Sequence, residues 1–226
     1  MGMIAAQRMT AALLGGSMST AQLETMLNTP QGLAAWKLCA ATDALARPLA
    51  TDPAARAVWL ASTKAMDAMA PLSEYGADAI AQSTTHIQAI FNTSARADAW
   101  FANTTTRAAI WKSDKALLAL QGSVTGKARA RACEKYLTRT ESTQAATPKT
   151  FAAPLDSSTG RFIMIAWSAV NQTSVTMHSR RGGSNAGNAV QALAGGADVD
   201  NVMALNGPVR VATSANTTVS IGVLEV

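Results

Sequence analysis

The sequence contains few of the residues that metal sites and disulfide-stabilised folds require. Its 226 residues include two cysteines and two histidines. Cys39 and Cys133 stand far apart, so their spacing indicates neither a disulfide framework nor a zinc site. His86 and His178 belong to no metal-ligand pattern such as HExxH, and solvated or packed histidines account for both. We therefore expect neither a metal nor another cofactor.

Nucleophilic and phosphate-binding motifs are missing as well. The chain has no GxSxG sequence, and GGSNAG at 182–187 lacks the Lys-Ser/Thr of a phosphate loop. Cys39 lies in an alanine-rich helical stretch, where a buried structural thiol is the ordinary interpretation. Asp198 and Asp200 alternate on an expected loop without a third acidic partner. The sequence thus predicts no catalytic residues, and we expect that the protein is not an enzyme.

A long apolar run is also absent. Arg8 interrupts the apolar residues near the amino terminus, and no basic segment precedes them. This pattern fits neither a signal peptide nor a membrane-spanning helix. We expect synthesis in a cytoplasm, no membrane insertion, and arrival at any other location by assembly.

Alanine supplies much of the 48% hydrophobic content, while aromatic residues make up 5%. Alanine favours helix formation but buries little apolar area per residue. A single copy of such a helical chain would be marginally stable, and homo-oligomerisation is the common remedy. The composition therefore predicts association with further copies of the chain.

Positive charge is concentrated at 107–139, within a chain of net charge +5. A solvated helix face explains this basic cluster best. Nucleic-acid binding is not expected, because neither interleaved aromatic residues nor a recognisable binding module accompanies the charges. Contact with an acidic neighbouring subunit is the alternative.

Pairs of small polar residues recur about every ten residues between Ser19 and Ser123. The units begin at Ser19, Asn28, Thr42, Thr51, Ser62, Ser73, Ser83, Asn92, Asn103, Ser113 and Ser123. Ser, Thr, Asn and Asp are the preferred helix N-caps, so we expect short helices, each closed by the cap of its successor. One long helix with an eleven-residue period is the alternative, which Pro48 and Pro71 oppose. Repeats of this kind are typical of scaffolds.

The rest of the chain is expected to hold two more helices, a linker and a strand-rich domain. The helices are expected at 3–14 and 126–139, and the composition of 141–148 is that of a linker. Beyond the linker, strands are expected at 149–153, 161–170, 172–179, 208–214 and 217–226. The predicted fold class is α+β: a helical repeat region at 1–140, a linker at 141–148, and an antiparallel β-sandwich or jelly-roll-like domain at 149–226.

One long loop, 180–201, is the candidate binding site, and a short helix over 189–193 could interrupt it. His178, Arg180, Arg181 and Asn185 place polar and cationic groups at its tip. These groups could bind a carbohydrate or an acidic partner, whereas ordinary exposure or a subunit contact are the alternatives.

Three stretches resemble tailed-bacteriophage virion proteins. STKAMDAMA from Ser62 and, more loosely, AQSTTHIQAIF from Ala81 are similar to their Ser-x-x-Ala-Met-x-Ala-Val units, which recur about every ten residues. The closing GPVRVATSANTTVSIGVLEV looks like the end of phage fibre and appendage proteins. The resemblance implies a structural component of a virion: a tail-fibre, baseplate or other appendage protein. It also implies a homotrimer that contacts other virion proteins, with a host-surface glycan as a further candidate partner.

Two other functions remain open. A capsid decoration or head-fibre protein would have the same composition. A carbohydrate-binding module for host recognition would gather aromatic residues in a groove. Four of the five tryptophans lie in the repeat instead, and Trp167 lies in an expected strand, where burial is favoured.

Overall fold

The computed structural model describes residues 2–133, 136–143, 149–151, 162–168, 174–179, 189–194, 201–205, 209–213 and 217–226. Contacts divide the chain into two compact units. The first consists of Met1–Ile90 and Ala99–Ala116, and the second of Phe91–Asp98 and Leu117–Val226.

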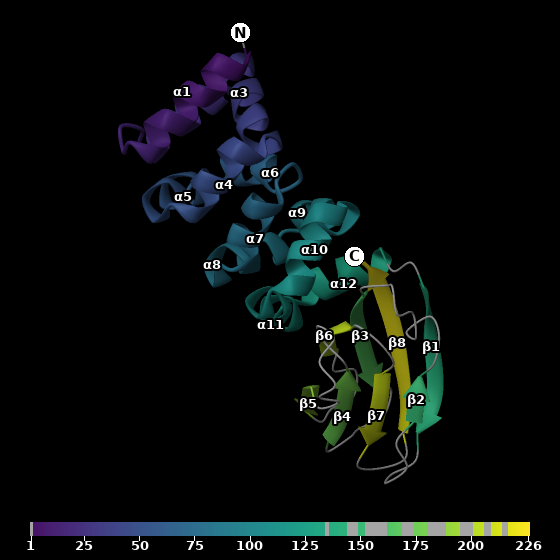
Figure 1. The fold of residues 1–226 in the computed structure, drawn as a ribbon. Coiled ribbons are helices and arrows are strands. Elements are labelled where there is room, and N and C mark those ends of the chain that lie inside the picture. The colour runs from purple at the N-terminus through teal and green to yellow at the C-terminus, as the bar shows by residue number, and fades with distance from the viewer. Residues whose placement is uncertain are drawn as a thin grey trace. The chain divides into compact units, whose positions relative to one another are not determined.

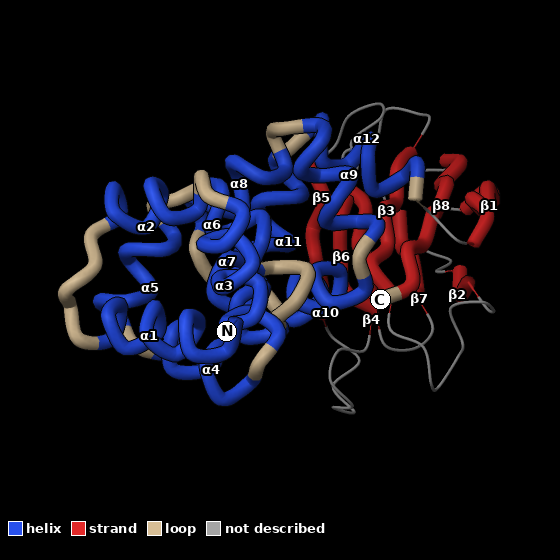
Figure 2. The backbone as a smooth tube through the Cα atoms, turned by 90° about the horizontal axis from the view of Figure 1, so that it is seen from above, coloured by secondary structure: helices blue, strands red, loops and turns tan. Residues whose placement is uncertain are grey.

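Twelve helices follow one another in the described stretch 2–133, most of them two to three turns long (Figure 1). They are α1 (Gly2–Leu14), α2 (Thr20–Leu27), α3 (Pro30–Ala41), α4 (Asp43–Thr51), α5 (Pro53–Leu60), α6 (Thr63–Met69), α7 (Glu74–Ala81), α8 (Thr84–Phe91), α9 (Ser94–Ala102), α10 (Thr104–Lys112), α11 (Asp114–Gly122) and α12 (Val124–Ala132). Tight connections separate them (Figure 2). The alternative of one long helix is therefore wrong.

Side-chain caps start most of these helices. The residues whose side chain accepts a hydrogen bond from the third helical amide include Ser19, Thr29, Asp52, Ser62, Ser73, Asn103, Ser113 and Ser123. Proline follows the cap directly in α3 and α5, where its missing N–H costs nothing. Short capped helices are thus confirmed, although α3 and α5 begin one residue later than predicted.

In the first unit, helices that are three places apart in the chain pack against each other: α4 on α1, α7 on α4 and α10 on α7. Side-chain hydrogen bonds join residues 28 to 36 positions apart, as when Arg47 Nη2 donates to Tyr75 Oη at 2.8 Å and Lys64 Nζ to Asn28 Oδ1 at 2.7 Å. Each ten-residue unit of the sequence therefore forms one helix. Three successive helices make one layer, which packs on the layer before it.

Two tryptophans are the largest fully buried side chains in the core of the first unit. Trp36 and Trp59 are fully buried. Their indole N–H groups donate to the carbonyls of Ala65 and Leu49, both at 2.9 Å. A buried tryptophan needs such a partner, so each indole also fixes the position of a neighbouring helix.

The second unit contains α12 and the described strands. Arg129 of α12 lies 3.7 Å from Asp98, and both side chains are about half exposed, so the pair adds little stability. The strands are β1 (Tyr136–Thr143), β2 (Lys149–Phe151), β3 (Phe162–Ser168), β4 (Ser174–Ser179), β5 (Ala189–Ala194), β6 (Asn201–Leu205), β7 (Val209–Thr213) and β8 (Thr217–Glu225). They pair in the orders β1-β8-β3-β6 and β2-β7-β4-β5, and each pairing is antiparallel.

The predicted fold class is wrong. The continuous described stretch, 2–132, is almost entirely helical, and the described residues show neither a β-sandwich nor a jelly roll. Alternating β-branched residues indicate strands, but they do not determine how paired strands pack into layers. The predicted domains, 1–140, 141–148 and 149–226, stay predictions.

Three local predictions are also corrected. The helix expected at 126–139 ends at Ala132, and β1 follows, because β-branched Thr138 and Thr140 alternate with other residues there. The expected linker, 141–148, begins inside β1, and 144–148 lie outside the described residues. The segment considered as a short helix, 189–193, belongs to strand β5.

Candidate interaction surface on the first two helices

The predicted loop site is only partly described. His178 lies in β4, where its backbone pairs with Val190 of β5 and Arg210 of β7. Arg180, Arg181 and Asn185 lie outside the described residues. A binding site at this loop tip therefore stays a prediction.

The buried thiol of Cys39 is a packing group. Its Sγ donates a hydrogen bond to the carbonyl of Ala6 at 3.3 Å and accepts one from Thr10 Oγ1 at 3.4 Å. Burial raises the pKa of the Cys39 thiol, and the hydrogen bond from Thr10 lowers it by less. A protonated, enclosed thiol is a poor nucleophile, and here it joins α3 to α1.

The histidine of the repeat has a local role. His86 Nδ1 lies 2.6 Å from Ser83 Oγ at the start of α8. This contact resembles the side-chain pair of a capping box. Among the described residues, no group of three or more His, Cys, Asp and Glu side chains could hold a metal ion.

Three of the four tryptophans in the described repeat are buried, and the fourth, Trp111, is partly exposed. Trp36, Trp59 and Trp100 are buried, so their faces are not offered to a sugar ring. None of the described helices combines the length and apolar character needed to cross a bilayer.

The principal hollow near the amino terminus is an apolar groove between α1 and α2. Its volume is about 560 Å³. We name it the methionine groove, and it is lined by Ile4, Ala5, Arg8, Met9, Ala12, Met18 and Met26. An adjoining hollow of about 450 Å³ shares Met18 and Met26 with it.

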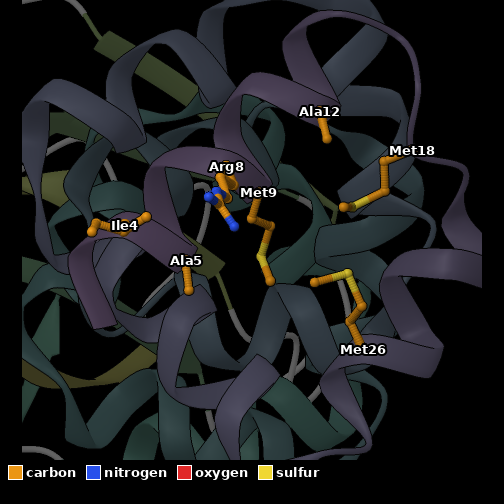
Figure 3. Close-up of a pocket in the computed structure, with 7 residues that line it drawn as sticks. All are labelled: Ile4, Ala5, Arg8, Met9, Ala12, Met18 and Met26. Carbon is orange, nitrogen blue, oxygen red and sulfur yellow. The ribbon is translucent and has the colours of Figure 1, made fainter. Parts of the chain in front are cut away.

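Three elements position the methionines. Met9 belongs to α1, Met18 to the connection and Met26 to α2. In Figure 3 their side chains extend toward the same open space, and Arg8 lies beside it. Methionine is flexible and polarisable, so this lining can adapt to the shape of an incoming apolar side chain.

Helix α1 is apolar on both of its faces. Ala6, Met9 and Leu13 are buried against the unit. On the outer side, Met3 is 46%, Ile4 59% and Leu14 39% exposed, and Met26 of α2 is 37% exposed. Exposed apolar surface of this kind marks an interaction site.

Arg8 gives the methionine groove its electrostatic character. It is the one charged residue among the seven described residues that line the groove. A guanidinium at an apolar surface forms charge-assisted hydrogen bonds with a carboxylate. The groove can therefore hold apolar side chains together with one acidic group of a partner.

This surface could not be predicted from the sequence. Residues 3–14 indicate a helix, in which Arg8 interrupts an apolar run. One signal was present, since five of the ten methionines fall within the first 26 residues. Which of them face outward depends on how α1 and α2 pack.

Residues 2–132 form an α-helical repeat, and its first two helices carry an apolar groove, the candidate interaction surface. No protein-family model matches the chain, and no curated protein matches it. The resemblance to phage virion proteins therefore stays a prediction.

Proposed function

We propose that the chain is a structural component of a phage virion, in a tail fibre, baseplate or other appendage, and acts through protein–protein assembly. The observation that carries the assembly role is the methionine groove, together with the exposed apolar side chains of α1 and α2. The phage assignment is supported by the resemblance of STKAMDAMA, which forms the N-cap Ser62, helix α6 and its C-cap Ala70. The partners are further copies, as a homotrimer, and neighbouring virion proteins.

The exposed area sets the strength of this contact. Met3, Ile4, Leu14 and Met26 are each between a third and three-fifths exposed. Covering the exposed parts of all four contributes on the order of 4 kcal/mol, since a fully buried large side chain contributes roughly 1.5–3 kcal/mol. Association also costs translational and rotational freedom, so covering these four side chains would not by itself hold two copies together. A stable trimer must therefore add contacts beyond them, and assembly into a larger particle supplies further ones.

The proposal is tested by the solution mass of the full chain, from light scattering behind size exclusion. We expect three times the 23.4 kDa mass of one chain. Ile4→Asp/Met26→Asp places two carboxylates in the methionine groove and is expected to give monomers with an unchanged far-ultraviolet spectrum. Leu72→Asp is the matched control, because Leu72 is an exposed apolar residue outside the groove.

A wild-type monomer at every concentration would contradict self-assembly. A double variant that remains trimeric would show that the methionine groove is not the contact.

A further inference from the structure

A second groove in the first unit has the opposite chemistry. Its volume is about 760 Å³, and α5, the junction of α7 with α8, and the start of α11 line it. We name it the cationic groove, because Arg56 and Lys115 line it and no carboxylate does among the described lining residues. His86 and the hydroxyls of Thr84 and Thr85 add polar groups to its wall.

Both cations have donors to offer a ligand. Arg56 uses Nη1 in a long hydrogen bond to the carbonyl of Ala50, 3.4 Å away. A guanidinium has five N–H donors, so most of its donors remain available. Lys115 is exposed, and no hydrogen bond or ion pair of its ammonium is found among the residues that the structure describes. Two cations beside one hollow, without a carboxylate in its lining, favour an anionic ligand.

The rest of the lining distinguishes between classes of anion. Ala57, Ala61 and Ala79 are small apolar residues that line the same groove. No Phe, Tyr or Trp lines it among the described residues, so nucleic-acid bases would have only the imidazole of His86 on which to stack. A polypeptide can instead place its backbone and methylene groups on the alanines and its carboxylates on the cations.

We propose that the cationic groove binds an acidic segment of a neighbouring protein, whose carboxylates pair with Arg56 and Lys115. Lys115 belongs to the basic cluster at 107–139, and this contact gives that member of the cluster a role. The contact is independent of the phage assignment and of the methionine groove, because no residue lines both grooves.

The test is a titration of the full chain with a fluorescein-labelled hexaglutamate peptide, followed by anisotropy at low salt. Arg56→Glu/Lys115→Glu is expected to weaken binding about tenfold or more, since two exposed ion pairs become repulsive. Lys37→Glu/Lys64→Glu is the control with the same change of net charge, and both of its residues are exposed and outside the groove. The control is expected to weaken binding less than about threefold, because screened charges act weakly at a distance. Arg56→Lys/Lys115→Arg keeps both charges and should bind as the wild type does.

The solution masses of the same variants separate this proposal from the proposed function. Lost peptide binding with an unchanged oligomeric mass supports the cationic groove, whether or not the wild type is a trimer. If Arg56→Glu/Lys115→Glu and Lys37→Glu/Lys64→Glu weakened peptide binding equally, the effect would come from net charge alone, and the proposal would be overturned. It is also overturned if the wild type shows no binding at 1 mM peptide. A further outcome is that the wild type binds a labelled oligothymidine more tightly than the hexaglutamate peptide. If Arg56→Glu/Lys115→Glu abolished that binding, the groove would be a nucleic-acid site and the proposal would be overturned.

Discussion

The hydroxyl group of Ser113 makes two hydrogen bonds inside the first unit, and a Ser113→Ala substitution would remove both. As the cap of α11, it accepts a hydrogen bond from the amide of Ala116 at 3.2 Å. It also donates at 2.8 Å to the carbonyl of Ala81, the last residue of α7 and 32 positions earlier in the chain. One buried hydroxyl thus serves the start of one helix and the end of another.

The two losses have separate magnitudes. Removing a serine cap costs about 1 kcal/mol. The carbonyl of Ala81 is at a helix end, where it has no partner within the helix, and Ala81 is buried. Leaving a buried acceptor without a donor costs a further 1–3 kcal/mol or so. We therefore expect Ser113→Ala to reduce the free energy of unfolding by about 2–4 kcal/mol.

Ser73→Ala is the matched control. Ser73 is also a buried cap, accepting from the amide of Gly76 at 3.2 Å. No donation by its hydroxyl is found among the described residues. Ser73→Ala is expected to cost about 1 kcal/mol, the value of the cap alone.

Urea unfolding followed by the helical circular-dichroism signal measures both variants. We expect a larger fall in the midpoint for Ser113→Ala than for Ser73→Ala, with the denaturant slope unchanged. Equal costs would refute the argument, because the bond between distant helices would then add nothing beyond the cap.

Three further predictions concern single residues of the first unit. Gly32→Ala should destabilise it by about 3 kcal/mol or more, since the added Cβ would lie 2.1 Å from the backbone oxygen of Met26, which cannot move as a side chain can. Cys39 should react with Ellman's reagent only as fast as the unit opens, because burial encloses the thiol and raises its pKa. Asp78→Asn should become increasingly stabilising as the pH rises above 3.8, because burial raises the pKa of Asp78 in the folded state more than Lys112 lowers it.

The sign for Asp78 follows from proton linkage. Its folded pKa lies above the ordinary 3.8, so the folded state holds the proton more tightly than the unfolded state. The contribution of Asp78 to stability is therefore greatest below pH 3.8 and falls as the pH rises through the folded pKa. Asparagine does not titrate, so a stability difference that stays constant across this window would contradict the reasoning.

The other two predictions have simple controls. Gly122→Ala adds a Cβ with no atom within 4 Å, and it should change stability by less than about 0.5 kcal/mol. A Gly32→Ala protein as stable as the wild type would contradict the clash. Cys133, which is partly exposed, should react faster than Cys39. Equal rates in the folded protein would show that the core around Cys39 is open.

The short helices could be predicted from the sequence because capping is local. Ser62, Ser73 and Asn103 each bond an amide three residues ahead, so a residue type and its spacing suffice to indicate a helix start. The packing of every third helix could not be predicted in this way. It depends on contacts across about 30 residues, such as that from Arg47 to Tyr75.

The methionine groove could not be predicted from the sequence, because it too depends on contacts between distant residues. A helix at 3–14 follows from sequence, but the exposure of Ile4 and Met26 depends on which helices cover α1 and α2. The strand β1 was missed because basic residues suggested a continued helix, although its threonines favour a strand. Arg180 and Arg181 lie outside the described residues, so the predicted role of the loop tip that contains them has not been tested.

The central claim, a structural role in a virion, is tested most directly by peptide mass spectrometry of purified particles. The particles would come from cells carrying the genome that encodes this sequence, and the lysate from which they were separated would be measured beside them. We expect peptides of this chain to co-purify with the particles through a density gradient, at a ratio to the major capsid protein that stays constant across the particle fractions. A chain abundant in the lysate but absent from intact particles would contradict the claim.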